Sequence, residues 1–113
     1  MSNIYLQFLS ISRSLEITKK TSNDVDATSM LLLNEIAVQH FEEKPMRVSD
    51  AMDLKAIASP ATIHRKIDEL REAGLIDMVF QGQNRRTKYL IPTKSANAFF
   101  EKMSDSMLKA VKY

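Results

Sequence analysis

The side chains that could do chemistry in this sequence are cations and hydrogen-bonding groups in two segments. After Ser59, Thr62 can donate or accept a hydrogen bond, and Arg65 can form two parallel hydrogen bonds with one acceptor edge. The second segment, from position 78 to position 100, has no acidic residue and contains four basic ones: Arg85, Arg86, Lys88 and Lys94. Such groups favour binding of a polyanion over bond-breaking chemistry.

Catalytic and metal chemistry has no support in the sequence. The chain has no cysteine, two histidines and two glycines, which excludes thiolate zinc sites, iron–sulfur clusters and glycine-rich phosphate loops. Neither a G-x-S-x-G nor an H-E-x-x-H pattern occurs. We therefore predict no enzyme, no metal and no cofactor.

The chain has 113 residues, which is enough for one domain. Its 44% hydrophobic and 27% charged residues are typical of a globular protein, and its net charge of +2 decides little by itself. The first twenty residues lack a basic start, and no apolar run approaches the length of a membrane span. We therefore expect a cytoplasmic protein.

Two helices are expected in the N-terminal part of the chain. Apolar residues at helical spacing predict a helix over residues 3–17, and a polar linker follows over 18–26. Asp24 or Asp26 can cap the next helix, which we place at 27–43. Its buried stripe is predicted to contain Leu32, Leu33, Ile36, Ala37, His40 and Phe41.

The middle of the chain predicts two helices joined by a turn. Residues 46–48 form a short extended piece, and Ser49 caps a short helix. Ser59 caps a longer helix, with Pro60 at its first position, where the missing N–H is harmless. Gly74 ends this helix because glycine accepts the left-handed conformation. The buried stripe of the helix is Ile63, Ile67 and Leu70.

A hairpin and a last helix follow. The predicted elements are strands at 75–81 and 86–91, a turn at 82–85 and a helix at 94–111. The fold class is therefore α+β and mainly α: a winged helix-turn-helix with a small antiparallel hairpin, the wing, and flanking terminal helices. We expect a single domain over 1–113, with an N-terminal helix at 1–18, a winged helix-turn-helix core at 27–93 and a C-terminal helix at 94–113.

In this fold the longer helix enters a DNA major groove. At about 100° per residue, Thr62 and Arg65 lie away from the buried stripe, where they can meet a thymine methyl or a guanine edge. The basic turn of the hairpin suits a minor groove or the flanking backbone. The predicted DNA-binding residues are Ser59, Pro60, Ala61, Thr62, His64, Arg65, Lys66, Asn84, Arg85, Arg86 and Lys88.

Residues 28–93 resemble the MarR family of transcriptional regulators. The matching segments are Ser59 to Leu70, Ala73-Gly74-Leu75-Ile76, Asn84-Arg85-Arg86 and Leu90-Ile91-Pro92-Thr93. The resemblance implies that Thr62 and Arg65 meet bases and that Arg86 enters the minor groove. Asn84 stands where the family has an acid, which leaves Arg85 and Arg86 as alternatives for the minor-groove contact. The short terminal helices leave little room for an effector pocket, so we do not expect a small-molecule effector.

Both terminal helices carry enough apolar residues to indicate a homodimer. The predicted interface residues are Ile4, Phe8, Ile11, Leu15, Phe99, Phe100, Met103, Met107 and Val111. Alternatively, both helices pack on the winged-helix core of their own chain. A two-fold dimer would hold two recognition helices about one DNA turn apart.

We therefore expect a sequence-specific, double-stranded DNA-binding transcriptional regulator. Because no activation domain is apparent, repression by blocking polymerase access is the expected mode. The alternative is a winged-helix module that serves protein–protein contact, or replication of a plasmid or virus, rather than transcription. A structural adaptor that does not bind DNA is a third interpretation.

Overall fold

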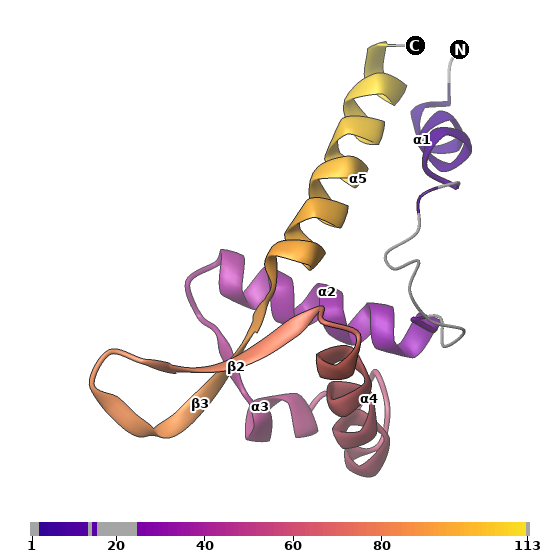
Figure 1. The fold of residues 1–113 in the computed structure, drawn as a ribbon. Helices are drawn as coiled ribbons and strands as arrows, with labels where there is room; N and C mark the ends of the chain where they lie inside the picture. Colours follow the sequence, from indigo (N-terminus) through magenta and orange to yellow (C-terminus); the bar gives the residue numbers. More distant parts are fainter. Residues whose placement is uncertain (1–2, 14, 16–24, 113) are drawn as a thin grey trace.

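The computed structural model describes residues 3–13, 15 and 25–112 of an elongated chain, with principal extents of 52 × 31 × 28 Å (Figure 1). The elements in chain order are α1 (Ile4–Ser12), α2 (Ala27–Phe41), β1 (Met46–Arg47), α3 (Val48–Met52), α4 (Pro60–Glu72), β2 (Ile76–Gln81), β3 (Asn84–Pro92) and α5 (Lys94–Lys112). The order of elements confirms the predicted winged helix-turn-helix, with β2 and β3 as the wing.

Helices α2, α3 and α4 share one apolar core with the sheet. From α4, the predicted stripe of Ile63, Ile67 and Leu70 is no more than 3% exposed. The other large buried side chains of this core are Leu32, Leu33, Ile36, Met46, Leu75, Ile76 and Leu90. Since each buried aliphatic side chain contributes about 1.5–3 kcal/mol, this packing dominates the position of α4.

The sheet has three antiparallel strands in the order β1-β3-β2. On one side of β3, Arg47 of β1 pairs with Tyr89, and on the other side Phe80 of β2 pairs with Lys88. The sequence predicted the extended piece at 46–48, but its pairing with the wing required the fold. As a result, the start of α3 lies beside the middle of the wing, where Val79 pairs with Tyr89.

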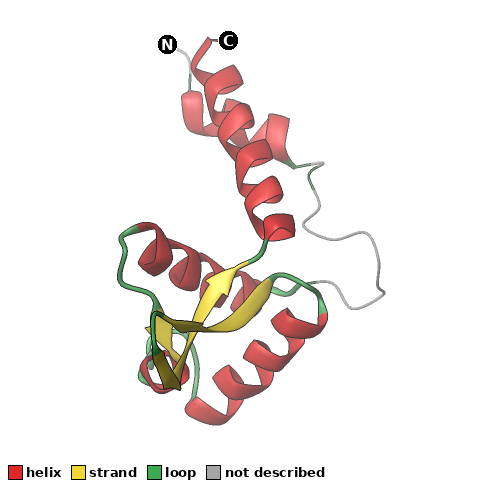
Figure 2. Cartoon of the chain, turned by 60° about the vertical axis from the view of Figure 1, so that its left-hand side comes forward, coloured by secondary structure: helices red, strands yellow, loops and turns green. Residues whose placement is uncertain are grey.

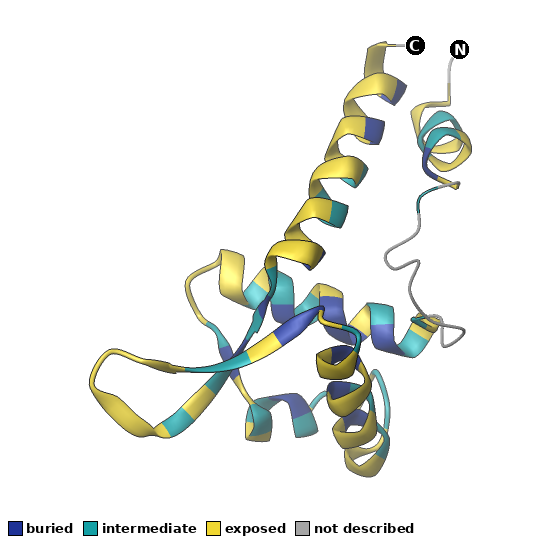
Figure 3. Cartoon of the chain, viewed as in Figure 1, coloured by how far each residue is buried: buried dark blue, intermediate teal, exposed yellow. Residues whose placement is uncertain are grey.

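Helix α5 projects from this core and carries α1 on its side (Figures 1 and 2). Ser12 of α1 and Ser106 and Ala110 of α5 are buried. Among the predicted interface residues, Ile4, Met107 and Val111 are 49%, 51% and 64% exposed. The half-buried ones are Phe8, Ile11, Leu15, Phe99, Phe100 and Met103. One long face of α5 is therefore open to solvent (Figure 3).

The prediction of a buried stripe on α2 is confirmed for Leu32, Leu33 and Ile36 and is wrong for the last turn of the helix. His40 is exposed, and Phe41 is 87% exposed. At about 100° per residue, His40 lies on the same side as Ile36, but one turn beyond the last buried residue of the helix. Phe41 lies about 140° around the helix from Ile36 and so points away from the core.

Several predicted boundaries shift. Helix α3 begins at Val48, so Ser49 is not its cap; instead Asp50 accepts a hydrogen bond of 3.0 Å from the Arg47 N–H. Strand β2 begins at Ile76 rather than at 75, and β3 extends over Asn84–Pro92 beyond the predicted 86–91.

The N-terminal helix is shorter than predicted, since α1 ends at Ser12. The end of the predicted 3–17 helix, most of the 18–26 linker and the alternative cap Asp24 lie outside the described residues. Helix α2 ends at Phe41 rather than at 43, because Glu43 takes a left-handed conformation with φ of 62°.

Asp26 connects the start of α2 to α4. Its carboxylate accepts the Ser29 N–H at 2.8 Å as the N-cap of α2, and it also accepts a hydrogen bond from the Lys66 ammonium of α4. Lys66 also donates to Glu69 at 3.1 Å. The Lys66 contact, and then the Ser29 N–H, lower the pKa of Asp26 from 3.8 to about 2. The folded protein therefore favours the charged carboxylate.

Replacing Asp26 with asparagine should keep the cap but remove the charge. We expect Asp26→Asn to lower the free energy of unfolding at pH 7 by less than about 1 kcal/mol, since the carboxylate is half exposed. Because the pKa is lower in the folded state, this difference should be full well above the unfolded value of 3.8 and should be lost progressively as the pH falls through about 2.

Urea unfolding of both proteins between pH 7 and pH 2 measures this difference. Asp105→Asn removes the same charge from an exposed position of α5 and is the matched control. A difference between Asp26→Asn and the parent that does not shrink between pH 7 and pH 2 would contradict the role of the Asp26 charge.

Candidate nucleic-acid interface

Helix α4 begins as the sequence predicted. Ser59 is the N-cap: its hydroxyl accepts the Thr62 N–H at 3.3 Å and donates to the Thr62 Oγ1 at 3.0 Å. Pro60 occupies the first helical position, where no N–H is needed. These contacts fix the first turn of α4, including the orientation of the Thr62 side chain. The Thr62 oxygen keeps a lone pair for a further donor.

The outward face of α4 carries three of the predicted contact residues. Ala61 and Arg65 are exposed opposite the buried stripe, and the His64 side chain is 66% exposed. His64 Nδ1 lies 3.7 Å from a carboxylate oxygen of Asp68. Arg65 therefore presents its guanidinium on the side of the helix that faces away from the core.

Lys66 does not belong with these outward residues. Its side chain is 11% exposed and is bound to Asp26 and Glu69. At about 60° from Ile63 around the helix, Lys66 lies at the edge of the buried face and next to α2. The prediction that Lys66 contacts DNA has no support from this geometry. Lys66 instead neutralises one of the two acidic residues, Asp68 and Glu69, that follow Arg65 on α4.

The strands of the wing lose their register toward its tip. Phe80 pairs with Lys88, but the next residue, Gln81, pairs with Asn84. Residues 85–87 of β3 therefore have no partner on β2, and the strands separate there (Figure 1). Such irregularities redirect side chains that a regular ladder would hold on alternate faces.

The two arginines of the wing tip have different surroundings. The Arg85 guanidinium lies over the Phe80 ring, 5.6 Å from its centroid. Arg86 donates its backbone N–H to the Asn84 side chain at 2.9 Å. Among the described residues, no hydrogen bond or ion pair of the Arg86 side chain occurs. The Asn84 contact orders the turn backbone and leaves the Arg86 guanidinium exposed.

Lys88 and Arg47 complete the basic surface. The Lys88 ammonium also lies over the Phe80 ring, at 5.4 Å. Arg47 of β1 binds Asp50 through two hydrogen bonds of 2.9 and 3.1 Å. This contact lowers the pKa of Asp50 and raises that of Arg47, so both stay charged.

Arg47 and Phe80 were missed by the sequence analysis. Arg47 is distant from the wing in sequence and joins it through the pairing of β1 with β3. From the sequence, Phe80 is an ordinary strand residue, although an aromatic residue shortly before the basic residues of a predicted hairpin is a signal that could have been used.

The outward face of α4 and the wing lie on the part of the molecule away from α1 and from the far end of α5 (Figures 1 and 2). Sequence positions 59–65 and 84–88 thus belong to elements that share one core. The described residues contain no helix long and apolar enough to span a membrane. Within the same residues, no group of three side chains could hold a metal ion.

No family model matches the sequence, and no curated protein is similar to it in sequence. Solved structures are similar in fold. A transcriptional regulator from Thermotoga maritima aligns with a TM-score of 0.63 and 16% identity, over 96% of this chain and 68% of its own. A MarR-like transcriptional regulator from the same organism aligns with a TM-score of 0.64 and 16% identity, over 96% of this chain and 74% of its own.

ZitR from Lactococcus lactis, described as a zinc-responsive MarR family member, is also similar. Its structure in complex with DNA aligns with a TM-score of 0.52 and 16% identity, over 96% of this chain and 70% of that one. The structural neighbours of this chain are thus MarR-family transcriptional regulators, and the fold is their winged helix. At such low identity, the similarity establishes the fold and assigns no role to a residue.

Removing the Ser59 hydroxyl should loosen the start of α4. We expect Ser59→Ala to lower the free energy of unfolding by about 1 kcal/mol, because the Thr62 N–H loses its acceptor, whereas Ser59→Asp should keep most of the stability. Urea unfolding measures both. Ser104→Ala, at an exposed position inside α5, is the control and should change stability little. An equal effect of Ser59→Ala and Ser104→Ala would contradict the capping role.

Proposed function

We propose that this protein binds double-stranded DNA in a sequence-specific manner and regulates transcription. The observation that carries the proposal is the joint presentation of an exposed α4 face with Arg65 and a basic wing tip with Arg86 on one core. The fold similarity to transcriptional regulators, one of them solved with DNA, supports the same function. A protein acting on DNA in this way would work in the cytoplasm.

Helix α4 is the proposed reader of the major groove. Ala61 is small, so the N-terminal turn can approach the base edges closely. Thr62 offers a hydroxyl and a methyl group, and Arg65 can donate two hydrogen bonds to a guanine, which discriminates by about 1–3 kcal/mol. Ser59, Pro60 and His64 lie around these two residues and are proposed to contact the backbone or the groove walls. Lys66 is not part of the proposed DNA-binding surface, since its ammonium is bound to Asp26 and Glu69.

Arg86 is the proposed minor-groove residue of the wing. Both Arg85 and Arg86 are exposed, but the Arg85 guanidinium lies over the Phe80 ring, whereas no such contact is formed by Arg86 in the described part of the chain. A narrow minor groove has an enhanced negative potential that attracts an inserted arginine. Asn84 supports Arg86 by ordering the turn backbone through their 2.9 Å hydrogen bond.

We also propose that two copies assemble through α1 and α5. Ile4, Met107 and Val111 remain about half or more exposed in the single chain, and Leu108 beside them is 58% exposed. An apolar surface of this kind on projecting helices fits burial against a second copy better than exposure to water. A two-fold dimer would place two α4 helices on neighbouring half-sites, and bound there it would act as a repressor by blocking polymerase.

The DNA contacts can be tested by selecting bound duplexes from a random pool and measuring affinities for the selected sequence. Arg65→Ala should relax the preference at one base position per half-site, at a cost of about 1–3 kcal/mol on the preferred sequence. Arg86→Ala should weaken binding most where the minor groove is narrow. Arg13→Ala, an exposed change at the end of α1, is the control and should have no effect.

Affinity for DNA should also fall as salt rises, in proportion to the number of phosphates contacted. Retention on duplex DNA without any sequence preference would contradict the proposed specificity. No retention at low salt would contradict DNA binding itself and favour a role in protein–protein contact.

The assembly can be tested by sedimentation at micromolar concentration. The protein should sediment at twice the mass of the chain, and Val111→Asp should produce single chains because it places a charge in the apolar surface. Phe41→Asp is the matched control, since Phe41 is exposed on α2, outside that surface. A parent protein that sediments only as a single chain would exclude the dimer.

A further inference from the structure

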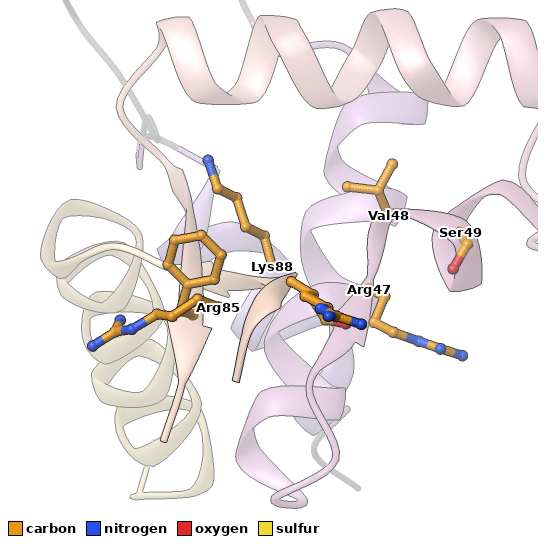
Figure 4. A pocket seen from close by; sticks show the side chains of 8 residues that line it. Arg47, Val48, Ser49, Arg85 and Lys88 are labelled. Atoms are coloured by element: carbon orange, nitrogen blue, oxygen red, sulfur yellow. The ribbon is translucent and has the colours of Figure 1, made fainter. Parts of the chain in front are cut away.

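The two ends of the wing differ in how their polar groups are arranged. An open pocket beside the wing is lined by Arg47, Arg85 and Lys88 among others, but the charged ends of these three residues point apart (Figure 4). They therefore do not converge on one ligand. At the other end of the hairpin, where β3 passes into α5, polar groups do converge, and they converge on Thr93.

Thr93 forms hydrogen bonds in two directions. Its hydroxyl donates to the carbonyl of Gly74 at 2.7 Å, and its backbone N–H donates to the carbonyl of Leu75 at 3.0 Å. The hydroxyl oxygen also accepts the Ala96 N–H at 3.2 Å, which makes Thr93 the N-cap of α5. One residue is thus bound both to the segment that follows α4 and to the first turn of α5.

The segment that follows α4 is itself fixed to that helix. The Gly74 N–H donates to the Arg71 carbonyl at 3.0 Å. The Leu75 N–H donates to the Leu70 carbonyl, also at 3.0 Å. These two bonds form a Schellman motif, for which Gly74 takes a left-handed conformation with φ of 74°. A continuous set of hydrogen bonds therefore connects the last turn of α4 with the first turn of α5 through Thr93.

Only the first turns of α5 pack against the core. Ala96 is fully buried, and Phe100 packs against the buried cluster. Beyond these turns α5 projects from the core with α1 at its side (Figure 1). Since α5 has 19 residues and rises about 1.5 Å per residue, it is about 28 Å long. A tilt of about 5° at its first turn would therefore move its far end by about 2.5 Å.

We propose that Thr93 is a positioning residue that fixes the angle between α4 and α5, and thereby the spacing of the two DNA half-sites that a dimer recognises. The proposal rests on the proposed function, because it requires assembly through α1 and α5 and entry of α4 into the major groove. In such a dimer, the direction of α5 in each chain sets the distance and the angle between the two α4 helices. Thr93 acts through this orientation and not by contact with a base.

The test compares duplexes whose two selected half-sites are separated by spacers of different length. Each added base pair moves one half-site by about 3.4 Å and rotates it by about 35°. The parent should bind one spacing best and lose about tenfold in affinity when the spacer changes by one base pair. Thr93→Val should lose only about threefold for the same change, because an α5 that is held less firmly adapts to the new spacing.

A second variant separates the capping of α5 from the link to α4. Thr93→Asp keeps an acceptor for the Ala96 N–H, so α5 stays capped, but a carboxylate cannot donate to the Gly74 carbonyl. We expect Thr93→Asp to lose spacing selectivity as Thr93→Val does. Thr93→Ser retains the hydroxyl and should keep the spacing profile of the parent.

Two controls distinguish this role from a general loss of structure. Thr93→Val and Thr93→Asp should bind a duplex with a single half-site as tightly as the parent, since α4 and the wing are unchanged. Ser95→Ala removes a hydroxyl from an exposed position in the same turn of α5. It is the matched control and should keep the spacing profile of the parent.

The proposal is overturned if Thr93→Asp keeps the sharp optimum of the parent, or if Thr93→Ser loses it. An equal loss of affinity at every spacing and at the single half-site would also overturn it, because that is the result of a structural role alone. If the parent binds DNA with a sequence preference but without a preferred spacing, the role of Thr93 is wrong while DNA binding stands. If the parent does not bind duplex DNA at low salt, the proposed function is wrong and the role of Thr93 is overturned with it.

Discussion

Ile63, Ile67 and Leu70 pack into the core beneath α2, α3 and the sheet, and this contact sets the rotation of α4 about its own axis. Burying three aliphatic side chains contributes several kcal/mol, so turning them toward water would be costly. Arg65, on the opposite side of the helix, faces solvent as a consequence. The surface proposed to meet DNA is thus a result of hydrophobic packing on the other side of the same helix.

Helix α4 also carries a lysine, Lys66, whose charge is used inside the protein. Lys66 lies at the edge of the buried face and binds Asp26 of α2, which connects the two helices by an ion pair. It also binds Glu69, so that an acid that would repel a phosphate is neutralised within the protein. A basic residue on a recognition helix can therefore help binding without touching DNA.

The wing depends on the central position of β3 in the sheet. Because β3 pairs with both β1 and β2, the start of α3 is brought beside the middle of the hairpin. The loss of register after Phe80 releases Arg85, Arg86 and Thr87 from the ladder. The cationic groups of Arg85 and Lys88 both lie over the Phe80 ring. Arg86 is exposed. The two neighbouring arginines therefore differ in what they can reach.

The sequence by itself determined the order of the elements and the faces of α4, because helix caps, apolar spacing and Gly74 are local signals that act within a few residues. It also located the basic hairpin, as a segment without acids. Only the tertiary structure decided which charges are paired, since Asp26 and Lys66 are forty positions apart in the sequence. It likewise decided that Arg47 joins the wing and that His40 and Phe41 are exposed. The spacing of apolar residues along one helix shows which side of the helix is buried. It does not show how far along the helix other elements cover that side.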